Sequence, residues 1–261
     1  MASQFIWYEL LTTDADGAQR FYSDVVGWTV TPGTQPGMDY RTLAAPDGEQ
    51  IGGLMQLTAQ MQQGGARPVW LGYVSTPDVD ATVKAIEAQG GKTQMPPTTI
   101  GAIGRIAMVA DPQGAPIYVM TPTPPSDSPN ARSRAFSRAA VGHCGWNELA
   151  TTDPKNAFAF YSGQFGWSDG GSMPMGEAGD YQFLNDESGM IGAVMNSAAG
   201  NRPSMWTYYF RVPDIDAARR TAESGGGTIM HGPEPVPGGD FILIGQDPQG
   251  AMFALVGQRN A

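Results

Sequence analysis

Short apolar runs with alternating polar positions make up much of the chain, and a few segments with helical spacing separate them. The first run, residues 5–11, is rich in bulky apolar side chains and has the period of a β-strand. Its alternation places Trp7 and Glu9 on one face and Tyr8 on the other. The pattern therefore predicts that the fold begins with a strand whose two faces carry different side chains.

A helix is predicted directly after this strand. Thr13 or Asp14 can cap its first turn, and Gly27 can end it. Between them, apolar residues recur at i, i+3, i+4, i+7 and i+8, namely Ala18, Phe21, Tyr22, Val25 and Val26. Turn-forming clusters then separate apolar runs around residues 40–44 and 51–57, which predict two or three antiparallel strands. The first quarter of the chain is therefore predicted as β-α-β-β-β.

The same order of elements recurs in the second quarter. Residues 69–74 form a predicted strand, and Asp78 caps a helix that two glycines end at residues 90–91. Strands follow at residues 103–110 and 115–120, joined by a tight turn. The third and fourth quarters restart this plan, so four β-α-β-β-β units are predicted in tandem.

The two halves of the chain are copies of one another. Trp, Glu, Thr-Thr-Asp, Phe-Tyr and Gly-Trp recur at a constant offset of 139 residues, which for the tryptophan runs from Trp7 to Trp146. The sequence Asp-Pro-Gln-Gly-Ala at residues 111–115 is repeated letter for letter at residues 247–251. A repeat of about 120 residues is long enough to be a domain. The duplication therefore predicts two domains with the same internal plan.

Residues 121–139 are rich in proline and serine, which excludes a helix or a central strand and predicts a linker. We therefore expect an α+β fold of four βαβββ modules, which form two domains related by pseudo-two-fold symmetry. The predicted domains are residues 1–122 and 140–261, and the Pro-rich linker is 123–139.

Composition and charge limit the classes of function. The chain has 261 residues, 41% of them hydrophobic, and no run approaches the roughly 18 apolar residues of a membrane span. A formal net charge of −10 disfavours binding to nucleic acid or to anionic lipid. The single cysteine, Cys144, cannot form an intrachain disulfide, and residues 1–10 do not resemble a signal peptide. We therefore expect a cytoplasmic protein with a small-molecule partner, and neither a nucleic-acid nor a membrane partner.

These motifs resemble those of the vicinal oxygen chelate superfamily of glyoxalases, bleomycin-resistance proteins and extradiol dioxygenases. The resemblance rests on Thr-Asp followed by Phe-Tyr and Gly-Trp, on Asp-Val-Asp-Ala with a Gly-Gly helix end, and on Asp-Pro-Gln-Gly before the last strand. It covers nearly the whole chain and implies two glyoxalase-like domains, each with a sheet that curls into a half-open cup. In enzymes of the superfamily, His, Gln or Glu on the first and last strands holds a divalent metal in the cup.

The positions that correspond to those metal ligands hold other residue types in this chain. They are Trp7, Leu71, Tyr118, Trp146, Thr207 and Ala254. None of these side chains suits zinc, nickel or iron, and the only histidines, His143 and His231, are not expected to meet. We therefore predict no metal and no other cofactor. The alternative is a carboxylate-only site with Glu9 and Glu148, which lie in different halves.

Without a metal, the linings of the cups decide the function. We expect a first cup lined by Trp7, Glu9, Tyr40, Tyr73 and Tyr118, and a second lined by Trp146, Glu148, Tyr181, Tyr209 and Arg211. Such linings suit the stacking of a flat, apolar or cationic molecule. Glu9 and Glu148 are the candidate catalytic residues, because an inward-facing carboxylate on a strand is costly to bury. Their alternative role is structural, as acids bonded to backbone N–H groups or to a tyrosine.

Three functions are compatible with these linings. The first is a metal-independent protein that binds a small aromatic, cationic or carbonyl-containing molecule. The second is a lyase, isomerase or hydroxylase-like enzyme with Glu9 or Glu148 as general base, and the third is a regulatory or scaffold protein with vestigial cups.

Trp70 and Trp206 fall on the strand face opposite the cup linings and are predicted to pack against helices. The tandem duplication predicts a monomer with internal pseudo-two-fold symmetry, with a homodimer as the alternative.

Overall fold

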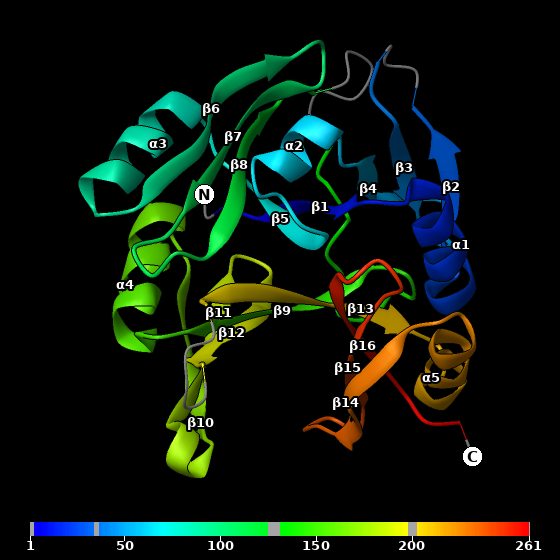
Figure 1. The fold of residues 1–261 in the computed structure, drawn as a ribbon. Coiled ribbons are helices and arrows are strands. Elements are labelled where there is room, and N and C mark those ends of the chain that lie inside the picture. Colours follow the sequence, from blue (N-terminus) through cyan, green and yellow to red (C-terminus); the bar gives the residue numbers. More distant parts are fainter. Residues whose placement is uncertain (1–2, 34–36, 125–130, 198–202, 261) are drawn as a thin grey trace. The chain divides into compact units, whose positions relative to one another are not determined.

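A computed structural model describes residues 3–33, 37–124, 131–197 and 203–260 (Figure 1). It confirms the predicted α+β fold, because a strand, a helix and three further strands occur four times in succession. None of the helices within the described ranges is long and apolar enough to cross a membrane.

The first two modules lie in the first half of the sequence. The first contains β1 (Phe5–Thr12), α1 (Ala15–Val26), β2 (Thr29–Pro32), β3 (Tyr40–Ala44) and β4 (Gln50–Gln56), and the short helix α2 (Ala59–Gln63) follows it. The second contains β5 (Val69–Ser75), α3 (Val79–Ala88), β6 (Lys92–Ile100), β7 (Gly104–Ala110) and β8 (Pro116–Pro122).

The third and fourth modules repeat this order. The third contains β9 (Cys144–Thr151), α4 (Pro154–Phe165), β10 (Ser168–Pro174), a 3-10 turn η1 (Gly176–Ala178), β11 (Asp180–Asp186) and β12 (Gly189–Asn196). The fourth contains β13 (Met205–Val212), α5 (Ile215–Ser224), β14 (Thr228–Pro235), β15 (Phe241–Gln246) and β16 (Met252–Gly257).

In each module the first strand pairs in parallel with the last, as β1 does with β4 and β13 with β16. A parallel pair needs a crossover connection, which the helix and the intervening strands provide. The strand order is β2-β3-β4-β1-β5-β8-β7-β6 in the first half and β10-β11-β12-β9-β13-β16-β15-β14 in the second.

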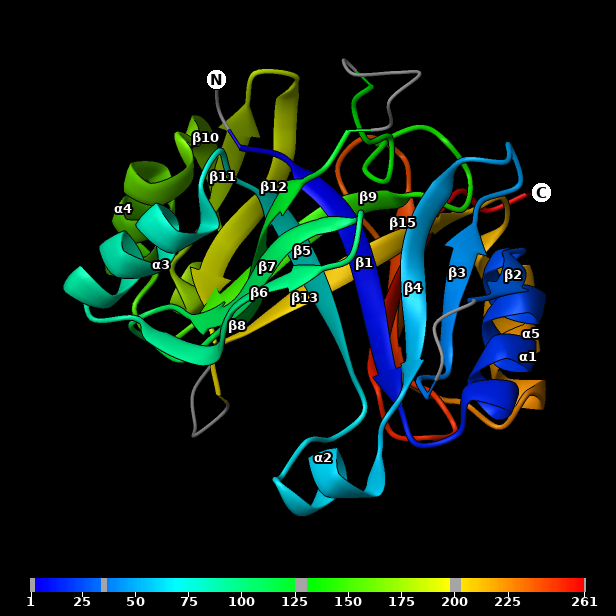
Figure 2. The ribbon, with the colours of Figure 1, turned by 90° about the horizontal axis from the view of Figure 1, so that it is seen from above.

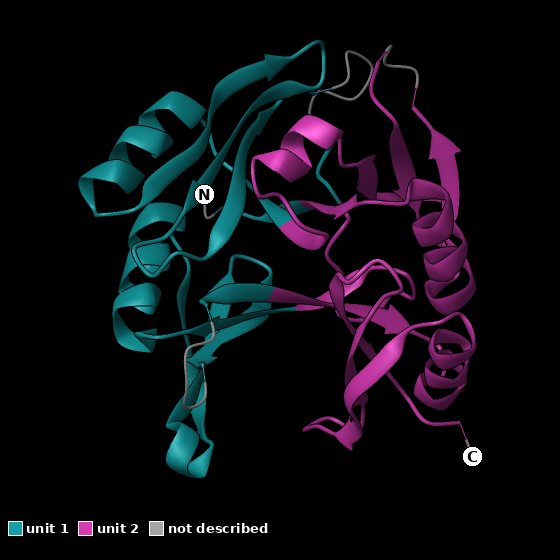
Figure 3. Cartoon of the chain, viewed as in Figure 1, with its two compact units in different colours: residues 1–6, 72–133, 147–206 teal, residues 7–71, 134–146, 207–261 magenta. Residues whose placement is uncertain are grey.

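The compact units of the chain combine modules from different halves (Figure 3). Unit 1 contains residues 1–6, 72–133 and 147–206, which are mainly the second and third modules. Unit 2 contains residues 7–71, 134–146 and 207–261, which are mainly the first and fourth modules. Within unit 1 α3 lies beside α4, and within unit 2 α1 lies beside α5 (Figures 1 and 2).

A buried hydrogen-bonded chain joins the two modules of unit 2. Trp70 Nε1 donates to Tyr22 Oη at 2.9 Å, and Tyr22 Oη donates to Asp247 Oδ2 at 3.0 Å. Tyr22 comes from α1, whereas Asp247 opens the Asp-Pro-Gln-Gly turn before β16. The Phe-Tyr motif of the first half therefore contacts the Asp-Pro-Gln-Gly motif of the second half, which gives a structural reason for the repeat of both motifs.

Unit 1 contains the matching chain. Trp206 Nε1 donates to Tyr161 Oη at 3.0 Å, and Tyr161 Oη donates to Asp111 Oδ2 at 3.1 Å. Both tryptophans are buried against tyrosines of helices α1 and α4. The prediction that Trp70 and Trp206 pack against helices is therefore confirmed.

Local signals in the sequence set the helix ends as predicted. In each module the helix after the first strand has an aspartate as its N-cap. The carboxylate of each aspartate accepts a hydrogen bond from a backbone N–H of the first helical turn; the four caps are Asp14, Asp78, Asp153 and Asp214. Gly27 ends α1 with a φ of 86°, in the left-handed region that glycine adopts without strain.

The edge strands are the elements that sequence periodicity does not reveal. No strand is predicted at β6, β10 or β14, and each lies at an end of its strand order. Their residues are mostly exposed or half-buried, so they lack the apolar face that periodicity detects. β6 also contains Pro96 and Pro97 within a register shift between Met95 and Thr98, which only an edge strand tolerates readily.

The described part of the predicted linker, residues 123–124 and 131–139, contains no helix or strand apart from an isolated bridge between Phe136 and Cys144. Residues 125–130 lie outside the described residues. Further along, Ser133 Oγ donates to the carbonyl of Ile6 at 2.7 Å, and Ala135 is buried. The second part of the linker therefore packs against structured residues instead of acting only as a spacer.

Candidate ligand-binding site

Three strands of unit 2, together with Trp146 of β9, form a platform of apolar side chains. β16 pairs with β13 on one side and β15 on the other, and this register gives two rows across the strands. The rows are Tyr209–Ala254–Ile244 and Arg211–Val256–Ile242. Trp146, Ile242 and Ile244 pack, half-buried, against the buried cluster of Tyr209, Ala254 and Val256. We call these six apolar residues the aromatic platform.

Charged groups border the aromatic platform. Arg211 shares a row with Val256 and pairs with Asp240 through two bonds, from Nη1 to Oδ1 at 3.2 Å and from Nη2 to Oδ2 at 2.5 Å. The guanidinium of Arg138 lies 5.6 Å from the centre of the Trp146 ring, within the range of a cation–π contact. Two cations and one carboxylate therefore border an apolar surface.

Unit 2 also holds three predicted residues of the first cup. Trp7 Nε1 donates to Tyr40 Oη at 2.9 Å, and both residues are half-buried. Glu9 is 4% exposed, and it lies opposite Gly53 in the register of β1 with β4. A methyl group at Gly53 would overlap the Tyr40 hydroxyl, so the glycine allows the tyrosine to lie against β4.

The equivalent residues of the second half lie in unit 1. Tyr181 Oη donates to Glu148 Oε2 at 2.7 Å, and both residues are half-buried. Phe183 packs edge-on against Tyr181, with ring centres 5.7 Å apart. This short bond supports the predicted alternative in which the strand glutamate is bonded to a tyrosine, and it also makes a carboxylate–phenol pair that can exchange a proton.

Tyr73 and Tyr118 lie in unit 1 and stack on one another. They are neighbours in the parallel register of β5 with β8, and their ring centres are 4.3 Å apart with an interplanar angle of 13°. Each ring therefore covers one face of the other, and both residues are buried. In the second half, Tyr209 and Ala254 occupy the corresponding register pair.

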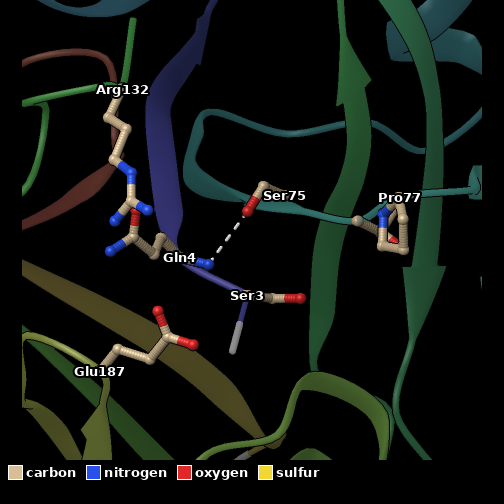
Figure 4. A pocket seen from close by; sticks show the side chains of 7 residues that line it. Ser3, Gln4, Ser75, Pro77, Arg132 and Glu187 are labelled. Carbon is tan, nitrogen blue, oxygen red and sulfur yellow. Dashed lines mark hydrogen bonds between the residues drawn. The ribbon is translucent and has the colours of Figure 1, made fainter. Parts of the chain in front are cut away.

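A shallow pocket of about 390 Å³ opens on unit 1 (Figure 4). It is lined by Ser3, Gln4, Ser75, Thr76, Pro77, Arg132 and Glu187, and the Gln4 backbone N–H donates to Ser75 Oγ at 3.0 Å. Most of these lining residues are of polar or charged types, and none of them was predicted for the cups. This pocket therefore differs in chemistry from the aromatic platform.

The family model of the Glyoxalase/Bleomycin resistance protein/Dioxygenase superfamily matches residues 4–119 and 140–255. The chain belongs to this superfamily. Each half of the sequence is one copy of the superfamily's domain, which agrees with the duplication of motifs.

Relatives and solved structures of this superfamily resemble the chain over nearly its whole length. CFP32 of Mycobacterium tuberculosis, which carries a provisional name as a glyoxylase, is 30% identical, with 96% of this chain and 93% of the relative covered. The anthracycline biosynthesis protein DnrV of Streptomyces peucetius is 29% identical, with 96% and 91% covered. The Mn(II)-bound glyoxalase from Novosphingobium aromaticivorans has a TM-score of 0.62 at 18% identity, with 99% and 82% covered. This last likeness shows the fold alone.

The divalent metal of the superfamily does not fit the residues present at its positions. In unit 2, Trp146 and Ala254 belong to the aromatic platform, and Thr207 offers a neutral hydroxyl. Leu71 and Tyr118 are buried and offer no strong ligand. Across the described ranges, no group of three or more His, Cys, Asp or Glu side chains could hold an ion.

The remaining candidates for metal or nucleophilic chemistry have structural partners. His143 Nδ1 lies 2.6 Å from the Arg134 carbonyl and Nε2 lies 3.1 Å from Asp47 Oδ2. His231 lies 2.6 Å from Glu234 at an exposed site. Burial raises the pKa of the Cys144 thiol to about 12, which keeps it protonated and unreactive.

The structure thus places the predicted lining residues in four groups. Trp7 with Tyr40, near Glu9, and Trp146 with Tyr209, near Arg211, lie in unit 2, whereas Glu148 with Tyr181 and Tyr73 with Tyr118 lie in unit 1. Each predicted cup is divided between the two units, so the complete cups stay predictions. Sequence reasoning missed Ile242, Ile244 and Val256, although their alternation in two predicted strands could have identified them. Asp240 and Arg138 carry no local signal.

Proposed function

We propose that this protein binds a small, planar, largely apolar molecule on the aromatic platform of unit 2, without a metal. The observation that carries the proposal is the packing of Trp146 against Tyr209, Ala254 and Val256. Two members of this cluster, Trp146 and Ala254, occupy positions that correspond by resemblance to metal ligands of the superfamily. Trp146 stays half-buried in this packing, so part of its surface remains available for a ligand.

The shape and polarity of the platform favour a flat ligand. Trp146 supplies a wide ring, and the half-buried Ile242 and Ile244 extend the apolar surface across β15. Covering such side chains contributes roughly 25 cal/mol for each Å² of apolar surface removed from water. Ring stacking adds about 0.5–1.5 kcal/mol for a well-placed aromatic pair. A fused aromatic system would gain both contributions.

The names of two relatives agree with this ligand class. DnrV and the related protein DauV of Streptomyces sp. are named for anthracycline biosynthesis. Anthracyclines contain planar fused rings that carry carbonyl and hydroxyl groups. Molecules of that general type would match an apolar surface bordered by charged groups.

Fluorescence titration with an anthraquinone tests the proposal. We expect quenching of tryptophan emission, and Trp146→Ala should weaken binding by about tenfold or more because it removes the largest ring of the platform. Met230→Ala is the matched control, since it removes an exposed apolar side chain from β14 of the same unit.

Metal independence is tested with the same titration. Protein dialysed against a chelator should bind the anthraquinone as tightly as protein supplied with Mn²⁺ or Zn²⁺. An affinity that rises tenfold with either ion, or an equal loss of affinity in Trp146→Ala and Met230→Ala, would contradict the proposal.

A second candidate function is acid–base catalysis by Glu148. The bond from Tyr181 to the Glu148 carboxylate favours it, because a phenol so placed can steady the carboxylate and relay a proton. In this reaction Glu148 would remove a proton from a carbon next to a carbonyl group of the substrate. Glu148→Gln should then abolish turnover of a carbonyl-containing substrate but retain the affinity for the ligand of the aromatic platform. Undiminished turnover of that substrate would exclude this role.

A further inference from the structure

We infer that the ligand of the aromatic platform carries an anionic group, which Arg211 binds in place of Asp240. This inference rests on the proposed function and adds the charge of the ligand to it. It assigns Arg211 as the residue that determines specificity. The ligand class is then a planar aromatic acid, such as a fused-ring carboxylate.

The pairing of Arg211 with Asp240 is already that of a guanidinium with a bound carboxylate. Both terminal nitrogens of the arginine meet both oxygens of the aspartate, and the side chains are 15% and 22% exposed. Arg211 Nε is buried and has no hydrogen-bond partner among the described residues. The forked geometry selects carboxylates by shape, and the Nε–H donor of the guanidinium remains unused.

Asp240 can leave this position without breaking a strand. It lies in the β14–β15 connection directly before β15, and its carbonyl accepts from the Val236 backbone N–H at 2.9 Å. The turn contains Gly238 and Gly239, with φ values of 102° and 89°. Its side chain is partly exposed, so rotation can carry the carboxylate into water while a ligand anion takes its place.

The charges around the platform favour such an exchange. Arg138 lies over Trp146, so the contacts described for the platform include two guanidinium groups and one carboxylate. A ligand anion would balance this local excess in a chain whose formal net charge is −10. The spacing also fits, because Arg211 follows Tyr209 by two residues, about 6.6 Å along a strand. That distance is close to the width of a fused ring.

The first half of the chain lacks these charges. By the register of β5, β8 and β7, Ser75 stands where the second half has Arg211, and Gly104 stands where it has Asp240. Ser75 Oγ instead accepts from the Gln4 backbone N–H. Selection for an anion is therefore a property of the second half, and the equivalent strand positions of the first half do not share it.

Two probes that differ by one charge test the inference. Anthraquinone-2-carboxylate and anthraquinone-2-carboxamide present the same rings, and their affinities for the full-length protein are measured by calorimetry. We expect the carboxylate to bind about tenfold or more tightly than the carboxamide, because charge-assisted bonds exceed neutral ones. Arg211→Gln should reduce this ratio to about one. Asp240→Asn should raise it severalfold, because the competing internal carboxylate is gone.

Controls separate binding from folding. Met230→Ala should keep the wild-type ratio, and thermal unfolding of each variant shows whether the fold is intact. Asp240→Asn keeps the side-chain shape, so its ratio is informative even if Arg211→Gln unfolds. Equal affinities of the two probes for the wild type, or a ratio that Asp240→Asn leaves at its wild-type value, would overturn the inference and leave the proposed function standing. Failure of both probes to bind would overturn both.

Discussion

Tyr22 and Tyr161 are the residues that link the repeated motifs to one another. Each hydroxyl accepts from a buried tryptophan and donates to the aspartate of an Asp-Pro-Gln-Gly turn. The other oxygen of that aspartate accepts two backbone N–H groups, from Gln249 and Ala251 in unit 2. The polar atoms of this Trp-Tyr-Asp network are thereby paired, which explains why the network persists in an apolar core.

Tyr22→Phe should destabilise the protein by about 1–3 kcal/mol, because it leaves the Trp70 N–H and an Asp247 oxygen buried without a partner. Urea denaturation measures the change, and Tyr161→Phe should have a similar effect. Tyr181→Phe is the control, since its half-buried hydroxyl site is accessible to replacement by water. A cost for Tyr22→Phe no greater than that of the control would show that the buried chain does not stabilise the fold.

The buried aspartates also predict a dependence of stability on pH. Burial raises the pKa of Asp247 above its usual value of 3.8. The Asp247 carboxyl group therefore stays protonated to a higher pH in the folded protein than in the unfolded chain. The resulting stability is complete below pH 3.8 and is lost as the pH rises through the folded pKa. The unfolding free energy of wild type minus that of Asp247→Asn should therefore fall as the pH rises.

Asp216→Asn provides the opposite case for the same measurement. The Arg259 guanidinium lowers the pKa of Asp216, so this residue contributes stability that disappears as the pH falls. Its wild-type-minus-variant difference should therefore grow with pH. The same slope for both variants would show that burial does not control the titration of Asp247.

At the scale of elements, a glycine in β4 leaves the space that an aromatic side chain of β3 occupies. Gly53 allows the Tyr40 hydroxyl to lie against the strand, where it accepts from Trp7. In the second half the register partner of Glu148 is Ala193, and the Tyr181 hydroxyl bonds to the glutamate. Both copies therefore hold the tyrosine of the second paired strand by a hydrogen bond through its hydroxyl, and the residue opposite the strand glutamate is glycine in one copy and alanine in the other.

Gly53→Ala should displace Tyr40 and break its bond to Trp7, at a cost of about 1–3 kcal/mol for the overlap. Tyr40→Ala removes the overlapping ring, so the double variant should lose less stability than the sum of the two single variants. Chemical denaturation of all four proteins measures this coupling. Strict additivity would mean that the Tyr40 ring does not constrain position 53.

Elements with strong local signals were predictable, and those without were not. Asp14 and Asp214 could be identified as caps because the cap and the helix it serves are neighbours in sequence. β6 was missed because its exposed residues and its two prolines show no apolar periodicity. This strand is formed through its antiparallel pairing with β7, which no local pattern reveals. In the candidate site, Trp146 and Tyr209 were predicted from strand alternation, whereas Asp240 depends on a hairpin whose course no local pattern reveals.

At the scale of the whole molecule, each compact unit is built from one module of each half. Tyr22 in the first half needs Asp247 from the second, and Tyr161 in the second needs Asp111 from the first. Neither half of the sequence therefore contains a complete core. Because one chain supplies both partners of each pair, we propose that the intact protein is a monomer.

Separate chains of residues 1–139 and 140–261 should each lack cooperative unfolding or self-associate, and mixing them should restore a cooperative transition. Sedimentation velocity of the intact 27.6 kDa chain should give one monomeric species at all concentrations tested. Two halves that each unfold cooperatively as monomers would contradict this account of the cores, and a dimer of the intact chain would contradict the proposed assembly.

The sequence by itself determined the duplication, the helix caps, the alternation of the strands, and the residue types that replace the superfamily's metal ligands. These features depend on spacing along the chain, which is visible without coordinates. Only the tertiary structure decided that modules of different halves share a core, that Trp146 packs beside Tyr209 and Ala254, and that Arg211 meets Asp240. Four modules with nearly the same pattern can pair in several ways, and the fit of buried surfaces between distant segments selects one of them.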